Sequence, residues 1–194
     1  MYIYVKRGLD ILCVVVAAPL WLPLMLVLAL LVGVSSRGGV FFRQKRYGRG
    51  RRFFEIYKFR SMYVDAPRDV PTHLLDNPDA FITPVGRFLR KFSLDELPQV
   101  INILKGELSL VGPRPALWNQ DDLMAARDRF AANDVPVGLT GLAQVMGRDE
   151  LSVEKKAQYD GEYARRMGLG LDIWILLSTV VVAVTGRGFK EGGS

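Results

Sequence analysis

Residues 11–34 read ILCVVVAAPLWLPLMLVLALLVGV, and this stretch decides how the chain meets its surroundings. It holds no charged residue over 24 positions, which as a helix is enough to cross a hydrocarbon core of about 30 Å. A secretory signal peptide is disfavoured, because the apolar run exceeds the usual ~7–15 residues and no A-x-A-like site follows. Pro19 and Pro23 lie near the middle, and each removes a helix hydrogen bond and crowds the preceding turn. The stretch therefore predicts a sharply bent membrane helix.

Basic residues flank this segment on both sides. They are Lys6 and Arg7 before it, and Arg37, Arg43, Lys45 and Arg46 after it. A spanning helix usually has its positive charge biased to one side. Symmetric flanks favour a helix that enters, bends at the prolines and leaves by the same leaflet. We therefore expect residues 1–36 to form a re-entrant membrane helix with both ends cytoplasmic; the alternative is a kinked span with its N-terminus outside.

The charge is unevenly distributed along the chain, whose net charge is +6. Residues 1–64 hold 11 Lys/Arg and 2 acidic residues, whereas residues 65–194 hold 15 and 18. A cationic front third around an apolar segment suits an anionic membrane surface, nucleic acid or a phosphate-rich substrate. The membrane segment and the acidic residues downstream argue against nucleic acid. A single cysteine, Cys13, excludes an internal disulfide.

Residues 37–194 are predicted to form a mostly helical α+β domain. Strands are expected at 40–42 and 53–62 around a basic loop at 43–52, and helices at 85–92, 95–104, 120–132 and 152–167. His73 lies in a long polar loop at 65–83 and is given no role. The apolar stretch 173–185 (IWILLSTVVVAVT) is too short to span a membrane and fits either an interfacial helix or a core helix.

Residues 93–99 read SLDELPQ and place two acids side by side. Ser93 and Glu96 have capping-box spacing, and Asp95 is an alternative N-cap that suits Pro98. The chemical interpretation is that a helix N-terminus depresses the pKa of Asp95 and binds phosphate with Arg90 and Arg114. Two carboxylates beside phosphates also suit Mg²⁺, and aspartate is a known nucleophile towards phosphorus.

Six blocks then carry a resemblance to a known family. They are KRGLDI (6–11), GGVFFRQKRYGRG (38–50), IYKFRSM (56–62), ITPVGRFLRKFSLDELPQVINILKGELSLVGPRP (82–115), GLTGLAQVMGR (138–148) and LDIWIL (171–176). In this order they resemble the bacterial sugar transferases, small monotopic phosphoglycosyl transferases that begin glycoconjugate assembly on a polyprenyl phosphate. The resemblance implies transfer of a phospho-sugar from a UDP-sugar to undecaprenyl phosphate, with release of UMP. It leaves the sugar open among glucose, galactose and N-acetylated or amino-deoxy sugars.

The resemblance also implies roles for particular residues. Asp95 would attack the sugar-bearing phosphorus and form an aspartyl phosphosugar, and Glu96 would help Asp95 to hold Mg²⁺. Arg90 and Arg114 would steady phosphate oxygens. The weaker candidates for substrate contacts are Lys58, Arg60, Gln144 and Arg148.

For the membrane segment, the resemblance implies a re-entrant break at Pro23, with Pro19 as an additional proline. It implies that residues 37–194 form a catalytic domain on the cytoplasmic face of the bacterial inner membrane, with interfacial amphipathic helices. By analogy with the family, it also implies a homodimer. The rival is a non-catalytic membrane anchor in which Asp95 is only a helix cap.

Overall fold

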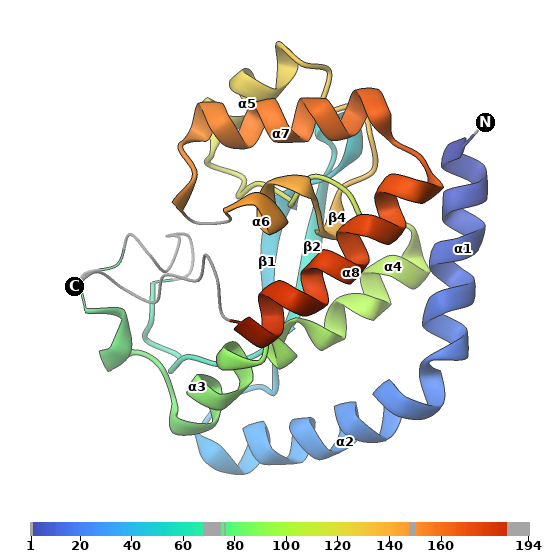
Figure 1. Ribbon diagram of the computed structural model, residues 1–194. Helices are drawn as coiled ribbons and strands as arrows, with labels where there is room; N and C mark the ends of the chain where they lie inside the picture. The colour runs from blue at the N-terminus through green and yellow to red at the C-terminus, as the bar shows by residue number, and fades with distance from the viewer. Residues whose placement is uncertain (1, 68–74, 76, 148–149, 186–194) are drawn as a thin grey trace.

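The computed structural model describes residues 2–67, 75, 77–147 and 150–185. The described chain is mostly helical with two small sheets, which confirms the predicted α+β class (Figure 1). Its main elements are α1 Tyr2–Val16, α2 Ala18–Ser35, β1 Phe41–Tyr47, β2 Phe53–Phe59, α3 Pro84–Lys91, the 3₁₀ helix η4 Leu94–Gln99, α4 Val100–Lys105, β3 Ser109–Val111, α5 Asp121–Asp128, β4 Gly138–Thr140, α6 Leu142–Met146, α7 Val153–Arg166 and α8 Leu169–Thr185.

The apolar segment bends once, at Ala17, where α1 ends and α2 begins. Pro19 lies in the first turn of α2, where its missing N–H costs no helix bond, whereas Pro23 lies inside α2. The expectation that the break lies at Pro23 was therefore wrong. Trp21 Nε1 donates to the Val14 carbonyl at 2.8 Å and so satisfies a carbonyl that the bend deprives of its helical partner.

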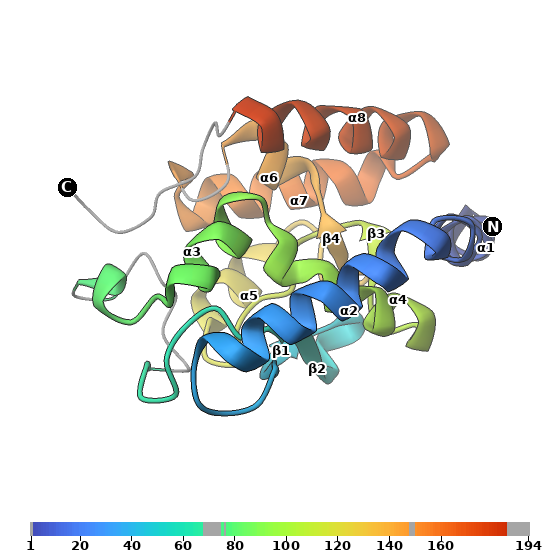
Figure 2. The ribbon, with the colours of Figure 1, turned by 90° about the horizontal axis from the view of Figure 1, so that it is seen from below.

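The pair of apolar helices forms a corner at one end of the molecule (Figure 1). Seen from below, α2 lies across the molecule between α8 and the β1–β2 hairpin (Figure 2). By length and composition α2 is long and apolar enough to cross a membrane, and most of its surface is exposed. Its inward side supplies Leu28 and Val32, which pack with Phe59 and Leu89. The inward side of α1 supplies Val14 to a second cluster with α4.

The β-hairpin is longer than predicted. β1 and β2 pair antiparallel from Phe41 opposite Phe59 to Tyr47 opposite Phe53, so half of the basic stretch 43–52 is strand rather than loop. Alternation explains the difference, because Gln44 is buried while Arg43 and Lys45 are exposed. A strand with charged residues on its exposed face resembles a loop in sequence.

A second, parallel sheet joins two segments for which no strand was predicted. β3 and β4 pair Ser109 with Gly138 and Val111 with Thr140. The backbones approach so closely that a Cβ on Gly138 would lie 2.1 Å from the Gly112 nitrogen. Glycine is therefore required where these strands meet, and the contact fixes the start of the loop GPRP (112–115).

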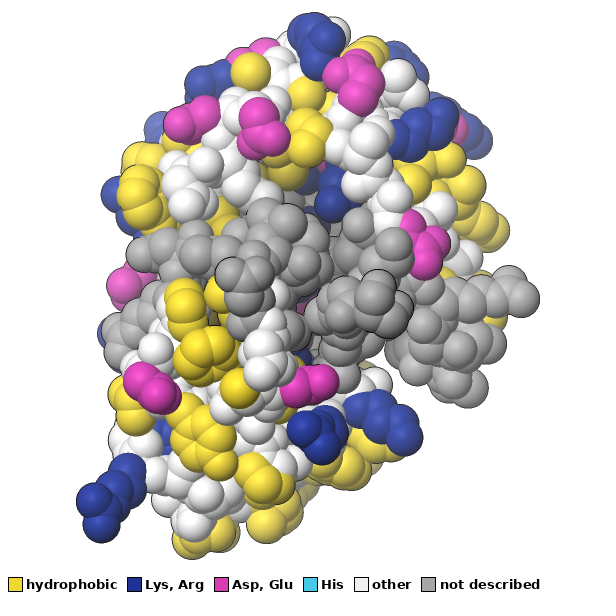
Figure 3. Space-filling view, turned by 90° about the vertical axis from the view of Figure 1, so that its left-hand side faces the viewer, with side chains coloured by type: hydrophobic (Ala, Val, Ile, Leu, Met, Phe, Trp, Pro, Cys, Tyr) yellow, Lys and Arg dark blue, Asp and Glu magenta, His cyan; other side chains and the backbone are white. Residues whose placement is uncertain are grey.

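Helices α7 and α8 complete the domain. Ser152 caps α7, the helix predicted at 152–167, because its side chain accepts from Lys155 N. α8 buries Ile175 against α7 and the parallel sheet but exposes Trp174 and Leu177. It therefore combines a core face with an exposed apolar face. Charged side chains of both signs gather over the opposite, upper part of the molecule, where α5 and α7 lie (Figures 1 and 3).

Arg127→Met in α5 tests how this upper part is held. Arg127 and Asp160 form a buried ion pair at 2.6 Å, and Arg127 also donates to the Arg114 carbonyl at 2.9 Å. Removing one partner leaves a buried carboxylate unpaired, so we expect a loss of about 3–5 kcal/mol in unfolding free energy. Denaturant unfolding in detergent micelles would measure it. The control is Arg51→Met, which breaks an exposed pair with Asp128 and should cost under about 1 kcal/mol. Equal losses of unfolding free energy in the two variants would contradict a stabilising role for the buried pair.

Candidate active site

The stretch 93–99 does not begin with a capped α-helix. Ser93 adopts a left-handed conformation (φ 54°) and makes no side-chain cap, and residues 94–99 form the 3₁₀ helix η4 before α4 starts at Val100. Both capping predictions, Ser93 with Glu96 and Asp95 alone, were wrong. The helix predicted to end at residue 104 ends at Lys105, followed by Gly106 in the left-handed conformation that stops a helix. The two adjacent acids therefore need another explanation than capping.

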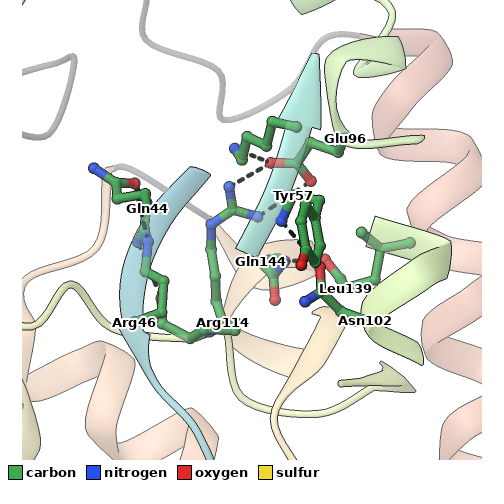
Figure 4. A network of polar contacts seen from close by, with 10 residues as sticks. Gln44, Arg46, Tyr57, Glu96, Asn102, Arg114, Leu139 and Gln144 are labelled. Carbon is green, nitrogen blue, oxygen red and sulfur yellow. Dashed lines mark hydrogen bonds and ion pairs between the residues drawn. The ribbon is translucent and has the colours of Figure 1, made fainter. Parts of the chain in front are cut away.

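Glu96 is held by two cations from distant parts of the chain. Lys58 Nζ on β2 lies 2.8 Å from Glu96 Oε1, and Arg114 lies 2.6 Å from the same oxygen (Figure 4). Burial opposes ionisation of Glu96, but Arg114 and Lys58 outweigh it and hold its pKa well below the usual range. Burial lowers the pKa of Lys58, while Glu96 and Asp95 act in the opposite direction. The three side chains form one buried charge cluster.

Buried polar contacts fix the segments that carry this cluster. Asn102 on α4 is fully buried, accepts from Tyr57 N at 3.0 Å and donates to the Glu55 carbonyl at 2.7 Å. It thus ties the η4–α4 segment to β2, where Lys58 follows. The loop 112–115 is held by Gly138 N on the Pro113 carbonyl (2.9 Å) and by Arg127.

Sequence reasoning missed two members of this network, Gln44 and Arg46. Arg46 donates to the Pro115 carbonyl at 3.0 Å and to Gln44 Oε1 at 2.6 Å, and it lies beside Arg114 (Figure 4). Burial, and then the like charge of Arg114, lower the pKa of Arg46 to about 9. The i, i+2 spacing of Gln44 and Arg46 was an available signal, because it puts both on one face of a strand.

Asp95 lies in a different setting from its neighbour. It lines a cavity of about 430 Å³ together with Lys58, Arg90 and residues of the hairpin. The pKa of Asp95 is raised, mainly by burial. The positive charge of Lys58 lowers this pKa in part, and the negative charge of Glu96 raises it further. The predicted depression of this pKa was wrong, because η4 places the carboxyl in a buried cavity rather than at a helix cap. Among the residues that the structure describes, Asp95 has no ion pair like the two that hold Glu96.

The remaining candidates are placed as follows. Arg90 lies near the end of α3, a helix that Thr83 caps by accepting from Gly86 N. Arg60 lines the Asp95 cavity, but its guanidinium donates to the Ser36 and Arg37 carbonyls, both at 2.7 Å, and so anchors the link between α2 and β1.

Gln144 donates to the Leu139 carbonyl at 2.9 Å and lines a second cavity, together with Glu96 and Arg114 (Figure 4). Arg148 and His73 lie outside the described residues.

The donor set fits Mg²⁺ only with help from a ligand. No group of three or more metal-ligating side chains occurs among the residues that the structure describes. Mg²⁺, however, commonly takes one or two carboxylates and completes its shell with phosphate oxygens and water. Asp95 suits the role of a Mg²⁺ ligand, because its carboxylate is buried and the nearby cations do not offset that burial. The carboxylate of Glu96, in contrast, is already paired with two cations.

The site thus combines two adjacent carboxylates in unlike environments with a group of cations that surround them. This chemistry suits a phosphate-bearing substrate, since like charges packed together are stabilised by an anion. A comparison with family models and curated proteins agrees with this. The model that describes bacterial sugar transferases matches residues 1–186.

Curated relatives carry names of the same kind. The chain is 39% identical over 195 residues to the UDP-N-acetylgalactosamine-undecaprenyl-phosphate N-acetylgalactosaminephosphotransferase of Aeromonas hydrophila, covering 98% of this chain and 46% of that protein. It is 43% identical over 189 residues to the UDP-glucose:undecaprenyl-phosphate glucose-1-phosphate transferase of Xanthomonas campestris pv. campestris, covering 93% and 39%. It is 36% identical to the exopolysaccharide production protein ExoY of Rhizobium meliloti, covering 94% and 87%.

The chain spans less than half the length of the first two relatives and most of the third. The match to the family model includes the apolar helices, the hairpin, SLDELPQ and the loop GPRP, the parts that build the charge cluster. The chain belongs to the bacterial sugar transferase family.

Proposed function

We propose that this protein is a phosphoglycosyl transferase that moves a phospho-sugar from a UDP-sugar to undecaprenyl phosphate and releases UMP. The observation that carries the proposal is the pair Asp95 and Glu96, one held by two cations and the other facing a cavity beside Lys58 and Arg90. The activities for which the Aeromonas and Xanthomonas relatives are named support this class of reaction.

The chemistry proceeds by two displacements at one phosphorus. An Asp95 carboxylate oxygen attacks the phosphorus that bears the sugar, the bond to the UMP oxygen breaks, and UMP leaves with that electron pair. An oxygen of the lipid phosphate then attacks the same phosphorus, and the Asp95 carboxylate leaves. The product is undecaprenyl-diphosphate-sugar, and Asp95 is restored for the next cycle.

The surrounding residues have distinct tasks in this scheme. Lys58 lies near both carboxylates and favours the ionised form of Asp95 that attack requires. Arg114 and Arg90 hold phosphate oxygens, which concentrates positive charge where the transition state gathers negative charge. Asp95 would hold Mg²⁺ together with oxygens of the diphosphate, and the ion would neutralise the charge of the leaving group. Glu96, the other expected ligand, is already paired with Lys58 and Arg114.

We further propose that α1 and α2 form a re-entrant pair at the cytoplasmic face of the bacterial inner membrane. Lys6, near the start of α1, forms a buried ion pair at 2.6 Å with Asp172 of α8. Arg60 holds the backbone just after α2. Both ends of the pair are therefore bound to the same domain, which supports a monotopic arrangement over a span. The homodimer expected from the resemblance stays a prediction.

Asp95→Asn is the direct test of the reaction. Because Asp95 caps no helix, asparagine should keep the fold but cannot act as the nucleophile. We expect Mg²⁺- and lipid-dependent UMP release from one member of a UDP-sugar panel, at least about 10³-fold slower in the variant and abolished by chelation. Retained activity in Asp95→Asn would refute the covalent step. No UMP from any donor would favour the non-catalytic anchor.

Lys58→Met tests how Asp95 is kept ionised. Lys58 is the strongest of the nearby cations that lower the pKa of Asp95, so its removal raises that pKa further. An acid with a raised pKa loses its attacking form at a higher pH. The acid limb of the pH profile of kcat/KM for the UDP-sugar should therefore move to higher pH, as initial rates would measure. If the acid limb stayed at the same pH while kcat/KM fell equally at every pH, Lys58 would instead act in substrate binding alone.

Topology is tested with a protease-cleavable tag on the N-terminus. If α1 and α2 re-enter, the tag lies on the same side as the catalytic domain and is cleaved in inside-out vesicles without detergent. Protection of the tag until detergent is added would establish a span instead. A tag after α8, in the same vesicles, reports the side of the catalytic domain.

A further inference from the structure

A second cavity is lined by residues of η4 other than Asp95, among them Leu94, Glu96 and Leu97. Its volume is about 340 Å³, and its walls are mainly aliphatic side chains from η4, β4, α6 and α8. They include Leu97, Leu139, Val145, Leu176 and Val180. The hydroxyls of Thr140 and Thr179 in this wall bond each other at 2.7 Å. We call this cavity the apolar groove.

The inner end of the apolar groove is charged. Glu96 and Arg114 both line it, so it reaches the same charge cluster that the Asp95 cavity reaches through Lys58. Lys58, Arg46, Arg90 and Arg114 together outnumber Asp95 and Glu96, which leaves a net positive charge for an anionic head group. A ligand that complements this shape is apolar along its length and anionic at one end.

The rim of the apolar groove continues into an exposed apolar surface. Val180 lines the groove and is 61% exposed. The exposed apolar residues of α8 recur with helical spacing on one face: Ile173, Trp174, Leu177, Val180 and Val181. Such a face on a protein with exposed apolar helices α1 and α2 is suited to lipid contact. A chain in the bilayer could enter the groove without crossing water.

We propose that the apolar groove is the subsite for the lipid acceptor, with the phosphate at Arg114 and the first isoprene units between η4, α6 and α8. The inference rests on the proposed function and extends it, because it gives the donor and the acceptor separate entrances to one phosphorus. A volume near the lower end of the ~300–1,000 Å³ typical of ligand sites holds only the head of the lipid. The rest of the chain stays in the bilayer.

The alternative occupant is part of the nucleotide sugar. Nucleotides and sugars need many hydrogen-bond partners, and this groove offers mainly aliphatic surface. The Asp95 cavity is better suited to them, since Arg43, Gln44, Glu55 and Tyr63 line it beside Lys58.

Val180→Asp is the test, assayed with undecaprenyl phosphate in detergent micelles. A carboxylate at the rim repels the lipid phosphate and disfavours the isoprene chain, so the KM for the lipid should rise about tenfold or more. UMP released in a single turnover without lipid, and the KM for the UDP-sugar, should stay at wild-type values. This burst also shows that the variant is folded.

Leu177→Asp is the matched control, because Leu177 lies on the same face of α8, is 65% exposed, and does not line the groove. It should leave the KM for the lipid within about twofold of wild type. An equal rise in both variants would assign the effect to general lipid contact and overturn the proposal. A rise in the KM for the UDP-sugar, or no change at all, would overturn it as well.

A direct label separates this inference from the proposed function. Farnesyl phosphate with a diazirine on its first isoprene unit should label residues 139–145 and 176–182, and excess undecaprenyl phosphate should compete. Labelling that falls on α2 instead would refute the groove even in an active enzyme. Labelling of the groove in a protein that releases no UMP would keep the lipid site and refute the transferase reaction.

Discussion

The buried carboxylate of Glu96 is the constraint on which the active-site region depends. A buried charge is stable only when partners and hydrogen bonds compensate it, and Glu96 finds them in Lys58 and Arg114. This contact fixes the hairpin, η4 and the loop 112–115 relative to one another. Neighbouring residues of a 3₁₀ helix point about 120° apart, so Asp95 faces a different cavity from Glu96, one that it lines together with Lys58 and Arg90. The adjacent acids thus lie in two different environments, a structural one for Glu96 and, in the proposed reaction, a chemical one for Asp95.

The end of the molecule where α1 meets α8 follows the same rule. Lys6 and Asp172 are almost completely buried and neutralise each other, and Tyr2 and Tyr163 donate to the remaining lone pairs of Asp172 at 2.7 and 2.9 Å. Removing either charge would leave the other without compensation. The basic residue that reads from sequence as a topology signal is therefore also a structural contact, and it binds the first apolar helix to α8.

Local patterns in the sequence were sufficient where local forces decide the structure. The apolar segment, α3, the Ser152 cap of α7 and the glycine that ends α4 follow from short-range rules. The break at Ala17, the full length of β1 and the parallel pair β3–β4 depend on partners distant in sequence. The same limit applies to the site.

Within the site, SLDELPQ and GPRP mark where the chemistry lies, but not which acid pairs with which cation. Arg46 and Arg127 were missed because they act on the loop 112–115 through its carbonyl groups, a contact that leaves no motif. Arg60 stands in a family block, yet its guanidinium holds the backbone at Ser36 and Arg37. A motif identifies the region of a site, whereas the role of each side chain follows from the groups that it contacts.

The arrangement of charge bears on how the proposed reaction would bring two unlike substrates to one site. The loop 112–115 is held by backbone and side-chain contacts from β4, α5 and β1, so Arg114 needs no substrate to be positioned. Preorganised cations lose little free energy to reorganisation when a phosphate arrives. Because Asp95 lines a polar cavity and Glu96 lines an apolar groove, the donor and the acceptor of the proposed reaction would reach the same charge cluster through two cavities of unlike chemistry. The short helix that carries both carboxylates lines both cavities.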